Sequence, residues 1–397
     1  MNLRKKNKLL FLILTIGLVI RIVLNNIIYS KDAESFVFWG KYLQDHSIAN
    51  LYEFLPGGFT PLPPLYYYVS RFLGEIVSFL NLWQNEWATY LIFKIPPILS
   101  ELVIAILIYW FVSKYLNKKW AIPPVAFYFL HPAIIYNTAV FGQIDSFVAS
   151  FAFIAVMLIV TKKYVMALVS YTIGILSKLQ DLAILPLIAA LILVNNSIKK
   201  LVIAAIVILP IALLPFLPIL FDKGFAWTAL YFKELPNWYP YTSVYAYNFW
   251  AFSGFLTPDK VKFLELVPYR LLGLAFYWII AALIVLPFFN TKNRKPEVIL
   301  FAAFLLFFDF AFFSTRVHSR YLIYSLPFAS VFVSLFPLEV VALSFLIILN
   351  LMLPMPYEEV RNLVLFLNQK TTIAFFTLFG LALFLVLMNK YKKLLER

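Results

Sequence analysis

The stretch MNLRKKNKLLFLILTIGLVIRIVLNNII, residues 1–28, decides the class of fold. A basic cluster is followed by apolar residues from Leu9 to Ile28. A membrane-spanning helix needs about 20 apolar residues, whereas the apolar core of a cleaved signal peptide has about 7–15 and ends at a small-residue site. This stretch is too long for a signal peptide and ends in polar residues. We therefore expect a retained first span whose N-terminus is cytoplasmic.

The composition of the whole chain agrees with a membrane protein. Of its 397 residues, 63% are hydrophobic and only 13% are charged, about half the roughly 25% charged residues of soluble domains. This excludes a large soluble enzyme and a disordered chain, because the first needs more surface charge and the second needs fewer apolar residues.

Eleven further apolar segments follow the first. They lie at about 95–113, 121–138, 146–161, 164–177, 181–194, 201–220, 271–289, 298–313, 321–336, 338–353 and 371–388. We predict an all-α polytopic membrane protein with about twelve transmembrane helices, forming a single integral membrane domain over residues 1–397.

The net charge of +14 is a signal of topology. Over half of the 33 Lys and Arg residues fall in alternate gaps between spans, namely Arg4/Lys5/Lys6/Lys8, Lys114/Lys118/Lys119, Lys162/Lys163, Lys199/Lys200, Lys292/Arg294/Lys295 and Lys390/Lys392/Lys393/Arg397. Cytoplasmic gaps carry such an excess of basic residues. Both termini are therefore expected in the cytoplasm of a multi-pass cell-membrane protein, and nucleic acid is not expected as a partner.

Two long outer loops remain, at about 30–93 and 222–269. Within the first, residues 63–81 are apolar but carry Arg71 and Glu75, and a span there would invert every later basic gap. We interpret this stretch as an amphipathic helix at the outer interface. The second loop is rich in Trp and Tyr, which suit the headgroup region. The chain has no cysteine, which excludes disulfides and thiolate metal sites.

Short polar turns fall at the outer ends of the expected spans. Asp32 and Glu34 follow the first span, and the others are FGQIDS (141–146), SKLQD (177–181) and STRVHSRY (314–321). Ionisable groups at membrane depth are costly and mark substrate paths, although loop ends are also polar simply because they are wet. Together, the turns favour an outer site for an anionic substrate rich in hydroxyl groups.

These turns resemble motifs of the GT-C glycosyltransferases, which take a sugar from a polyprenyl-phosphate carrier at the non-cytoplasmic face. In family order, the matching segments are DAESFVFWGKYL (32–43), LYEF…TPLPPLYYY (51–68), HPAIIYNTAVFGQIDS (131–146), SKLQ (177–180), YNFWAFSG (247–254) and TRVHSRYLIYSLP (315–327). The chain is similar to prokaryotic mannosyltransferase-like members and to the glucosyltransferases that extend the dolichol-linked oligosaccharide. It departs from the family pattern at Ser319, where glutamate is common, and at Thr60, where tyrosine usually precedes the prolines.

The resemblance implies an inverting transferase that moves a hexose, mannose or glucose, from a polyprenyl-phosphate donor to a hydroxyl of a lipid-linked, glycan or protein acceptor. Phosphate is a good leaving group, so one carboxylate suffices as general base. Asp32 matches the position of the family's first-loop aspartate, and Glu34 is expected to orient a hydroxyl or to replace it. The alternative is an interfacial aspartate paired with Lys31 or Lys41.

Four basic residues are expected to hold the phosphate of the donor, namely Lys178, Arg316, His318 and Arg320. Their alternative role is to bind lipid headgroups through snorkelling side chains. Gln143, Asp145 and Gln180 are expected to contact sugar hydroxyls or orient the basic residues, and structural polar networks suit them equally well. His46 and His131 are interpreted as local or core histidines.

No cofactor is expected. The sequence has no Asp-x-Asp, and Asp32 and Glu34 supply at most a partial oxygen site, so a divalent metal has no clear motif. Two other classes stay open: a multi-pass transporter or lipid flippase for an anionic or glycosylated substrate, and an inactive scaffold. The absence of paired repeats with broken helices disfavours the transporter.

Overall fold

The computed structural model describes residues 3–27, 30–52, 62–195, 198–290, 294–355 and 360–396. These form an all-α structure apart from one two-stranded hairpin. The chain divides into two compact units, each described by itself: the first comprises residues 1–107, 129–182 and 195–238, and the second comprises residues 108–128, 183–194 and 239–397. The basic gap at Lys292 and the expected motif around Thr60 lie outside the described residues.

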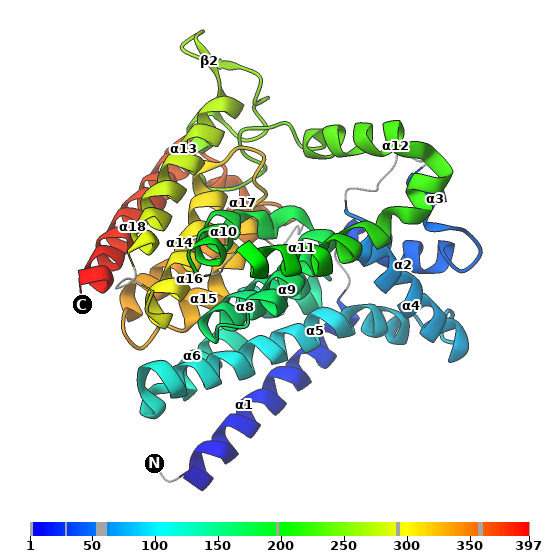
Figure 1. The fold of residues 1–397 in the computed structure, drawn as a ribbon, viewed down its shortest axis with the longest axis horizontal. Helices are drawn as coiled ribbons and strands as arrows, with labels where there is room; N and C mark the ends of the chain where they lie inside the picture. The colour runs from blue at the N-terminus through cyan, green and yellow to red at the C-terminus, as the bar shows by residue number, and fades with distance from the viewer. Residues whose placement is uncertain are drawn as a thin grey trace. The chain divides into compact units, whose positions relative to one another are not determined.

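The first unit contains the first helix of the chain, at residues 3–23, and the helices at 31–42 and 65–79 that follow it (Figure 1). Its elements are α1 (Leu3–Val23), η1 (Leu24–Asn26), α2 (Lys31–Tyr42), α3 (Ile48–Leu51), α4 (Leu65–Phe79), α5 (Glu86–Phe111), α7 (Pro132–Ile135), the π-helix η5 (Tyr136–Val140), α8 (Asp145–Val160), α9 (Tyr164–Ser177), the start of η6 (Leu179–Ile184), α11 (Ile198–Leu213), η7 (Leu214–Phe216), α12 (Leu217–Glu234) and η8 (Leu235–Asn237). The last turn of α5 belongs to the second unit.

The second unit is built around α14 (Pro296–Phe313), whose span is 83% buried. Its other elements are η3 (Val112–Asn117), η4 (Lys118–Trp120), α6 (Ile122–Phe129), α10 (Leu185–Asn195), η9 (Phe249–Ser253), β1 (Lys262–Phe263), β2 (Val267–Pro268), α13 (Tyr269–Val285), η10 (Leu286–Phe289), η12 (Tyr321–Ser325), α15 (Leu326–Ser330), α16 (Pro337–Met352), α17 (Arg361–Leu367) and α18 (Lys370–Glu396). The phenylalanines of α14 pack in the interior, as in the edge-to-face pair of Phe301 with Phe332, whose ring centres are 4.9 Å apart.

Six helical stretches among the described residues are long and apolar enough to cross a membrane, not the twelve expected. They are Lys5–Asn26, Glu86–Trp120, Lys199–Glu234, Tyr269–Phe289, Pro296–Phe313 and Lys370–Glu396. The other expected segments form shorter elements: α8, α9 and α16 have 16, 14 and 16 residues, fewer than the roughly 20 that cross a hydrocarbon core. The segment 121–138 is interrupted at His131, where α6 ends and α7 begins one residue later with a proline.

The amphipathic helix expected at 63–81 is confirmed as α4 (Figure 1). Arg71 and Glu75 form an exposed i,i+4 ion pair of 3.2 Å on one face, while Tyr66, Tyr67 and neighbours are buried on the other. This buried face packs on α2, with the ring of Trp39 edge-on to Tyr67 at 4.9 Å. The segment expected to be the first outer loop therefore carries a packed pair of helices.

The segment 222–269, expected to be the second outer loop, begins within a helix. The helical stretch continues through α12 to Glu234, and Gly224 bends it with a φ of 79°. Beyond it, the loop carries the β1–β2 hairpin, in which Lys262 pairs with Pro268 in antiparallel register. The hairpin extends beyond the N-terminal end of α13 (Figure 1).

Candidate functional site

Asp32 lies in the first turn of α2 and contacts a turn that is distant in sequence. Ser30 caps α2, because its Oγ accepts a hydrogen bond of 3.1 Å from the backbone N–H of Ala33. The same hydroxyl donates to the carbonyl of Phe141 at 2.5 Å. This cap fixes the start of α2 against the 141–146 turn, and Gln143 then donates from Nε2 to Oδ2 of Asp32 at 2.5 Å.

The backbone of the 141–146 turn is shaped by Gly142. Its φ is 68°, a left-handed conformation that favours glycine. A Cβ at this position would lie 2.7 Å from the Cβ of Ala33, so the close approach to α2 also requires a residue without a side chain. The N–H of Gln143 donates to the carbonyl of Asn137 at 2.9 Å. Gln143 is 1% exposed, so its amide is held in place by both backbone and packing.

Asp145 and Lys178 form a buried ion pair beside this turn. The Nζ of Lys178 donates to Oδ1 of Asp145, and the Nδ2 of Asn137 donates to Oδ2 at 3.4 Å. Because Lys178 neutralises Asp145 in a buried setting, the pair holds the start of α8 against the end of α9. The first unit thus brings four predicted site residues into two hydrogen-bonded pairs.

Glu34 and Gln180 are not drawn into these pairs. Glu34 is exposed on α2, and Gln180 is half-buried with no hydrogen-bond partner for its Oε1 among the described residues. Their expected roles toward a substrate hydroxyl stay predictions. His46 and His131 do make the local contacts expected of them: the ring of His46 stacks on Tyr42 at 4.0 Å, and His131 caps α7 by accepting from the N–H of Ala133.

In the second unit, His318 lies between two tyrosines. Its ring is edge-on to Tyr239 at 4.3 Å and tilted against Tyr321 at 5.2 Å. The backbone of His318 forms an isolated parallel β-bridge with that of Val244. The N–H of Ser319 donates to the carbonyl of Val244 at 3.0 Å. The 314–321 turn is therefore held by the second outer loop.

Arg316 is paired with an acid that sequence reasoning missed. Its Nε donates to Oδ2 of Asp259 at 2.6 Å, and Asp259 is fully buried. Arg316 itself has a φ of 64° and donates its N–H to the carbonyl of Tyr241 at 2.8 Å. The charge of Arg316 is therefore largely balanced by Asp259 within the fold. The guanidinium of Arg320 lies 6.0 Å from the centre of the Tyr321 ring, a cation–π distance.

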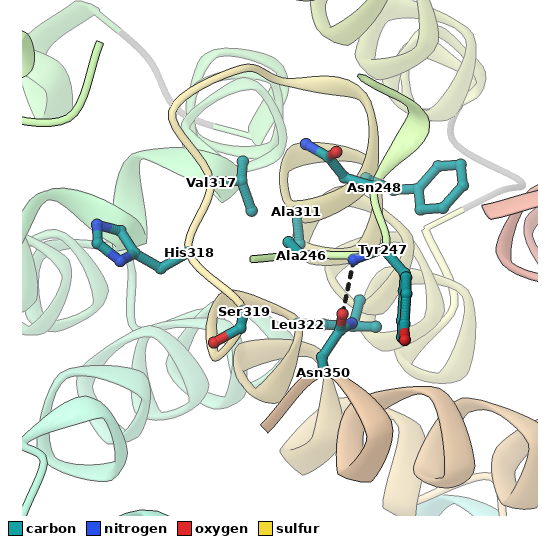
Figure 2. Close-up of a pocket in the computed structure, with 10 residues that line it drawn as sticks. Ala246, Tyr247, Asn248, Ala311, Val317, His318, Ser319, Leu322 and Asn350 are labelled. Atoms are coloured by element: carbon teal, nitrogen blue, oxygen red, sulfur yellow. Dashed lines mark hydrogen bonds between the residues drawn. The ribbon is translucent and has the colours of Figure 1, made fainter. Parts of the chain in front are cut away.

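A small cavity adjoins the 314–321 turn (Figure 2). It is lined by Ala246, Tyr247, Asn248, Ala311, Phe312, Val317, His318, Ser319, Leu322 and Asn350. The N–H of Tyr247 donates to Oδ1 of Asn350 at 2.7 Å. Oδ1 of Asn248 has no hydrogen-bond partner in the part of the chain that the structure describes. One of the residues that line the cavity, Asn248, thus carries an unsatisfied acceptor.

Three further buried charged residues, Arg21, Glu101 and Lys94, lie in the first unit and were not predicted. Arg21 of α1 donates from Nε to Oε2 of Glu101 on α5 at 2.5 Å, and both side chains are fully buried. Lys94, also on α5, is 3% exposed. The signal that could have found them is a charged residue inside an apolar run, which is rarely tolerated without a partner.

Among the described residues, no three His, Asp or Glu side chains gather into a set that could hold a metal ion. Metal dependence stays a matter for experiment. In comparisons with known proteins, no family model matched the chain and no curated protein matched its sequence.

Proposed function

We propose that the protein is an inverting glycosyltransferase that moves a hexose from a polyprenyl phosphate to an acceptor hydroxyl at the outer membrane face. The observation that carries the proposal is the hydrogen bond between Asp32 and Gln143. These residues come from two motifs that the resemblance assigns to one active site. Their contact across 111 positions of sequence is what such a site requires.

In the proposed reaction, Asp32 acts as general base. The acceptor oxygen attacks C1 of the sugar from the side opposite the phosphate, and its proton passes to the Asp32 carboxylate. The new C1–O bond forms as the bond from C1 to the phosphate oxygen breaks, and the polyprenyl phosphate leaves with that electron pair. Attack from the opposite side inverts the configuration at C1.

Gln143 would orient the base. An amide that donates to one carboxylate oxygen fixes the plane of the carboxylate, so that the acceptor hydroxyl meets it in a defined direction. Asp145 and Lys178 support the same turn from the other side through their buried pair. This arrangement supports a role for the turn in presenting Gln143.

For the donor phosphate, the proposal keeps the basic residues that the resemblance implies, namely His318, Arg320 and Arg316. Preorganised donors of this kind stabilise the charge that develops on a departing phosphate. The pair with Asp259 lowers the contribution expected from Arg316. A loss of His318 or Arg320 should therefore weaken donor binding more than a loss of Arg316.

The test is transfer from radiolabelled polyprenyl-phosphate mannose or glucose to a membrane lipid extract by the purified protein. Asp32→Asn should lower the rate by about 10²–10⁴-fold, the usual contribution of a general base. Asp45→Asn, which changes an exposed aspartate beyond the end of α2, is the matched control and should leave the rate unchanged. Full activity of Asp32→Asn would contradict the assignment of the base.

A second candidate function is transport, and buried carboxyls favour it. Asp181, in the first unit, and Asp309, in the second, are each fully buried, and neither carboxyl has a hydrogen-bond partner among the described residues. Carboxyls at membrane depth are common in proton and ion pathways. If the protein transfers no sugar but proteoliposomes show a proton flux that Asp309→Asn abolishes, the transporter replaces the transferase.

A further inference from the structure

Lys94 places a positive charge inside the first unit with no acidic partner. It is 3% exposed. Its Nζ donates to the carbonyl of Ala139 at 2.6 Å and lies 3.5 Å from the carbonyl of Asn25. Within the described residues, no carboxylate forms an ion pair with it. Lys94 is therefore a buried ammonium whose partners are backbone carbonyls.

Burial of the Lys94 ammonium lowers the free energy of unfolding. A buried ammonium loses its hydration, and backbone carbonyls replace only part of it. An apolar side chain of similar length would fill the same space at lower cost. A lysine at this position is accounted for only if its contacts hold the backbone in a way that an apolar side chain cannot.

The carbonyl that Lys94 binds best belongs to the end of η5. Ala139 is the penultimate residue of this π-helix, and the carbonyls at a helix C-terminus carry partial negative charge and lack intrahelical partners. The N–H of Phe141 closes the helix by donating to the carbonyl of Tyr136 at 2.7 Å. Lys94 thus caps the element that leads directly into the turn with Gln143.

The stem of Lys94 also lies beneath that turn. A Cβ on Gly142 would be 3.6 Å from Cε of Lys94 and 2.7 Å from Cβ of Ala33. Gly142 therefore lies against both α2 and the Lys94 side chain of α5. A shift of the Lys94 side chain would move Gly142, and with it the neighbouring Gln143 relative to Asp32.

We propose that Lys94 is a positioning residue of the active site: its ammonium holds the end of η5 so that Gln143 reaches Asp32. This inference rests on the proposed glycosyltransferase function. It concerns a residue that contacts neither substrate nor the reacting atoms and that acts only through Gln143.

The first test is kinetic. Lys94→Met removes the charge at nearly constant length, and we expect kcat to fall by about ten- to a hundredfold while KM changes by less than about threefold, as for a misplaced catalytic group. Lys94→Arg retains donors for the carbonyls and should recover most of kcat. Lys233→Met, which changes an exposed lysine on α12, is the control. Equal kcat for Lys94→Met and wild type would overturn the inference and leave the proposed function standing.

The second test does not depend on activity. Because the chain has no cysteine, Asp32→Cys with Gln143→Cys can be cross-linked selectively by a short bifunctional thiol reagent. We expect Lys94→Met to lower the cross-linking yield at least about twofold and Lys94→Arg to restore it, since only the ammonium or guanidinium holds the turn. An unchanged yield in monodisperse Lys94→Met protein would overturn the inference. If wild type transfers none of the sugars, the proposed function fails, and this yield still decides whether Lys94 sets the approach of Gln143 to Asp32.

Discussion

Gln143 donates its side-chain amide to the carboxylate of Asp32 at 2.5 Å, from a turn 111 residues farther along the chain. This bond joins the start of α2 to the turn before α8. A substitution of Gln143 removes this hydrogen bond and keeps the carboxylate of Asp32, so the two contributions can be measured separately.

Gln143→Met should lower the transfer rate by about tenfold. The substitution keeps the side-chain length but removes a hydrogen bond to a charged group, which contributes about 1.5–3 kcal/mol. Initial rates with saturating donor measure the effect. Gln369→Met, at an exposed glutamine that precedes α18, should behave as wild type. A wild-type rate for Gln143→Met would show that the amide does not orient the base.

Asp259→Asn should destabilise the second unit. Asp259 is fully buried and pairs with Arg316, so the variant removes a buried negative charge beside a largely buried guanidinium. Breaking such a pair costs about 3–5 kcal/mol. Thermal unfolding in detergent measures the loss as a lower Tm. Asp222→Asn, at an aspartate that is 51% exposed, should shift Tm far less; equal shifts in the two variants would contradict a structural role for Asp259.

Glu101→Gln should reduce the yield of folded protein. Glu101 accepts hydrogen bonds from Thr138 and from Ser146 besides its pair with Arg21. Removing its charge leaves Arg21 buried and uncompensated. The double variant Arg21→Met with Glu101→Met should be more stable than Glu101→Gln alone, because replacing both members of a buried pair by apolar side chains is often neutral. Size-exclusion profiles and Tm compare the two, and a less stable double variant would argue against this reasoning.

Alkaline pH should loosen the first outer loop. Burial raises the pKa of Tyr52 and that of Tyr67 above the ordinary value of 10.0. The unfolded chain releases these protons near pH 10 and the folded chain does not, so their contribution to stability is complete below about pH 10 and is lost as the pH rises above it. Limited proteolysis between pH 8 and pH 11 measures the opening. Tyr52→Phe should move its onset to higher pH, and an identical onset would exclude Tyr52 as a cause.

The sequence was most informative where a pattern is local. The alternation of apolar residues with Arg71 and Glu75 predicted an amphipathic helix, and α4 has the expected buried and exposed faces. The resemblance assigned Asp32 and Gln143 to one site, but it gave Gln143 a role toward sugar hydroxyls or basic residues and did not predict its hydrogen bond to Asp32. Such predictions depend on residues that lie within a few helical turns or in a recognisable motif.

Predictions failed where continuity or long-range pairing decides the structure. Hydropathy measures how apolar a segment is, but a break such as the one at His131 divides an apolar segment into two short helices. The partner of Arg316 lies 57 positions earlier in an unremarkable loop. The contacts of Lys94 are backbone carbonyls, which carry no sequence signal at all.

The bend at Gly224 limits the length over which one apolar helical stretch runs straight. Drawn straight, the 36 residues from Lys199 to Glu234 would extend about 54 Å, well beyond the roughly 30 Å of a hydrocarbon core. The bend at Gly224 divides them into a long limb of about 37 Å and a short one that leaves in a new direction. The conformation of Gly224 therefore separates the ten residues that follow it from the apolar limb.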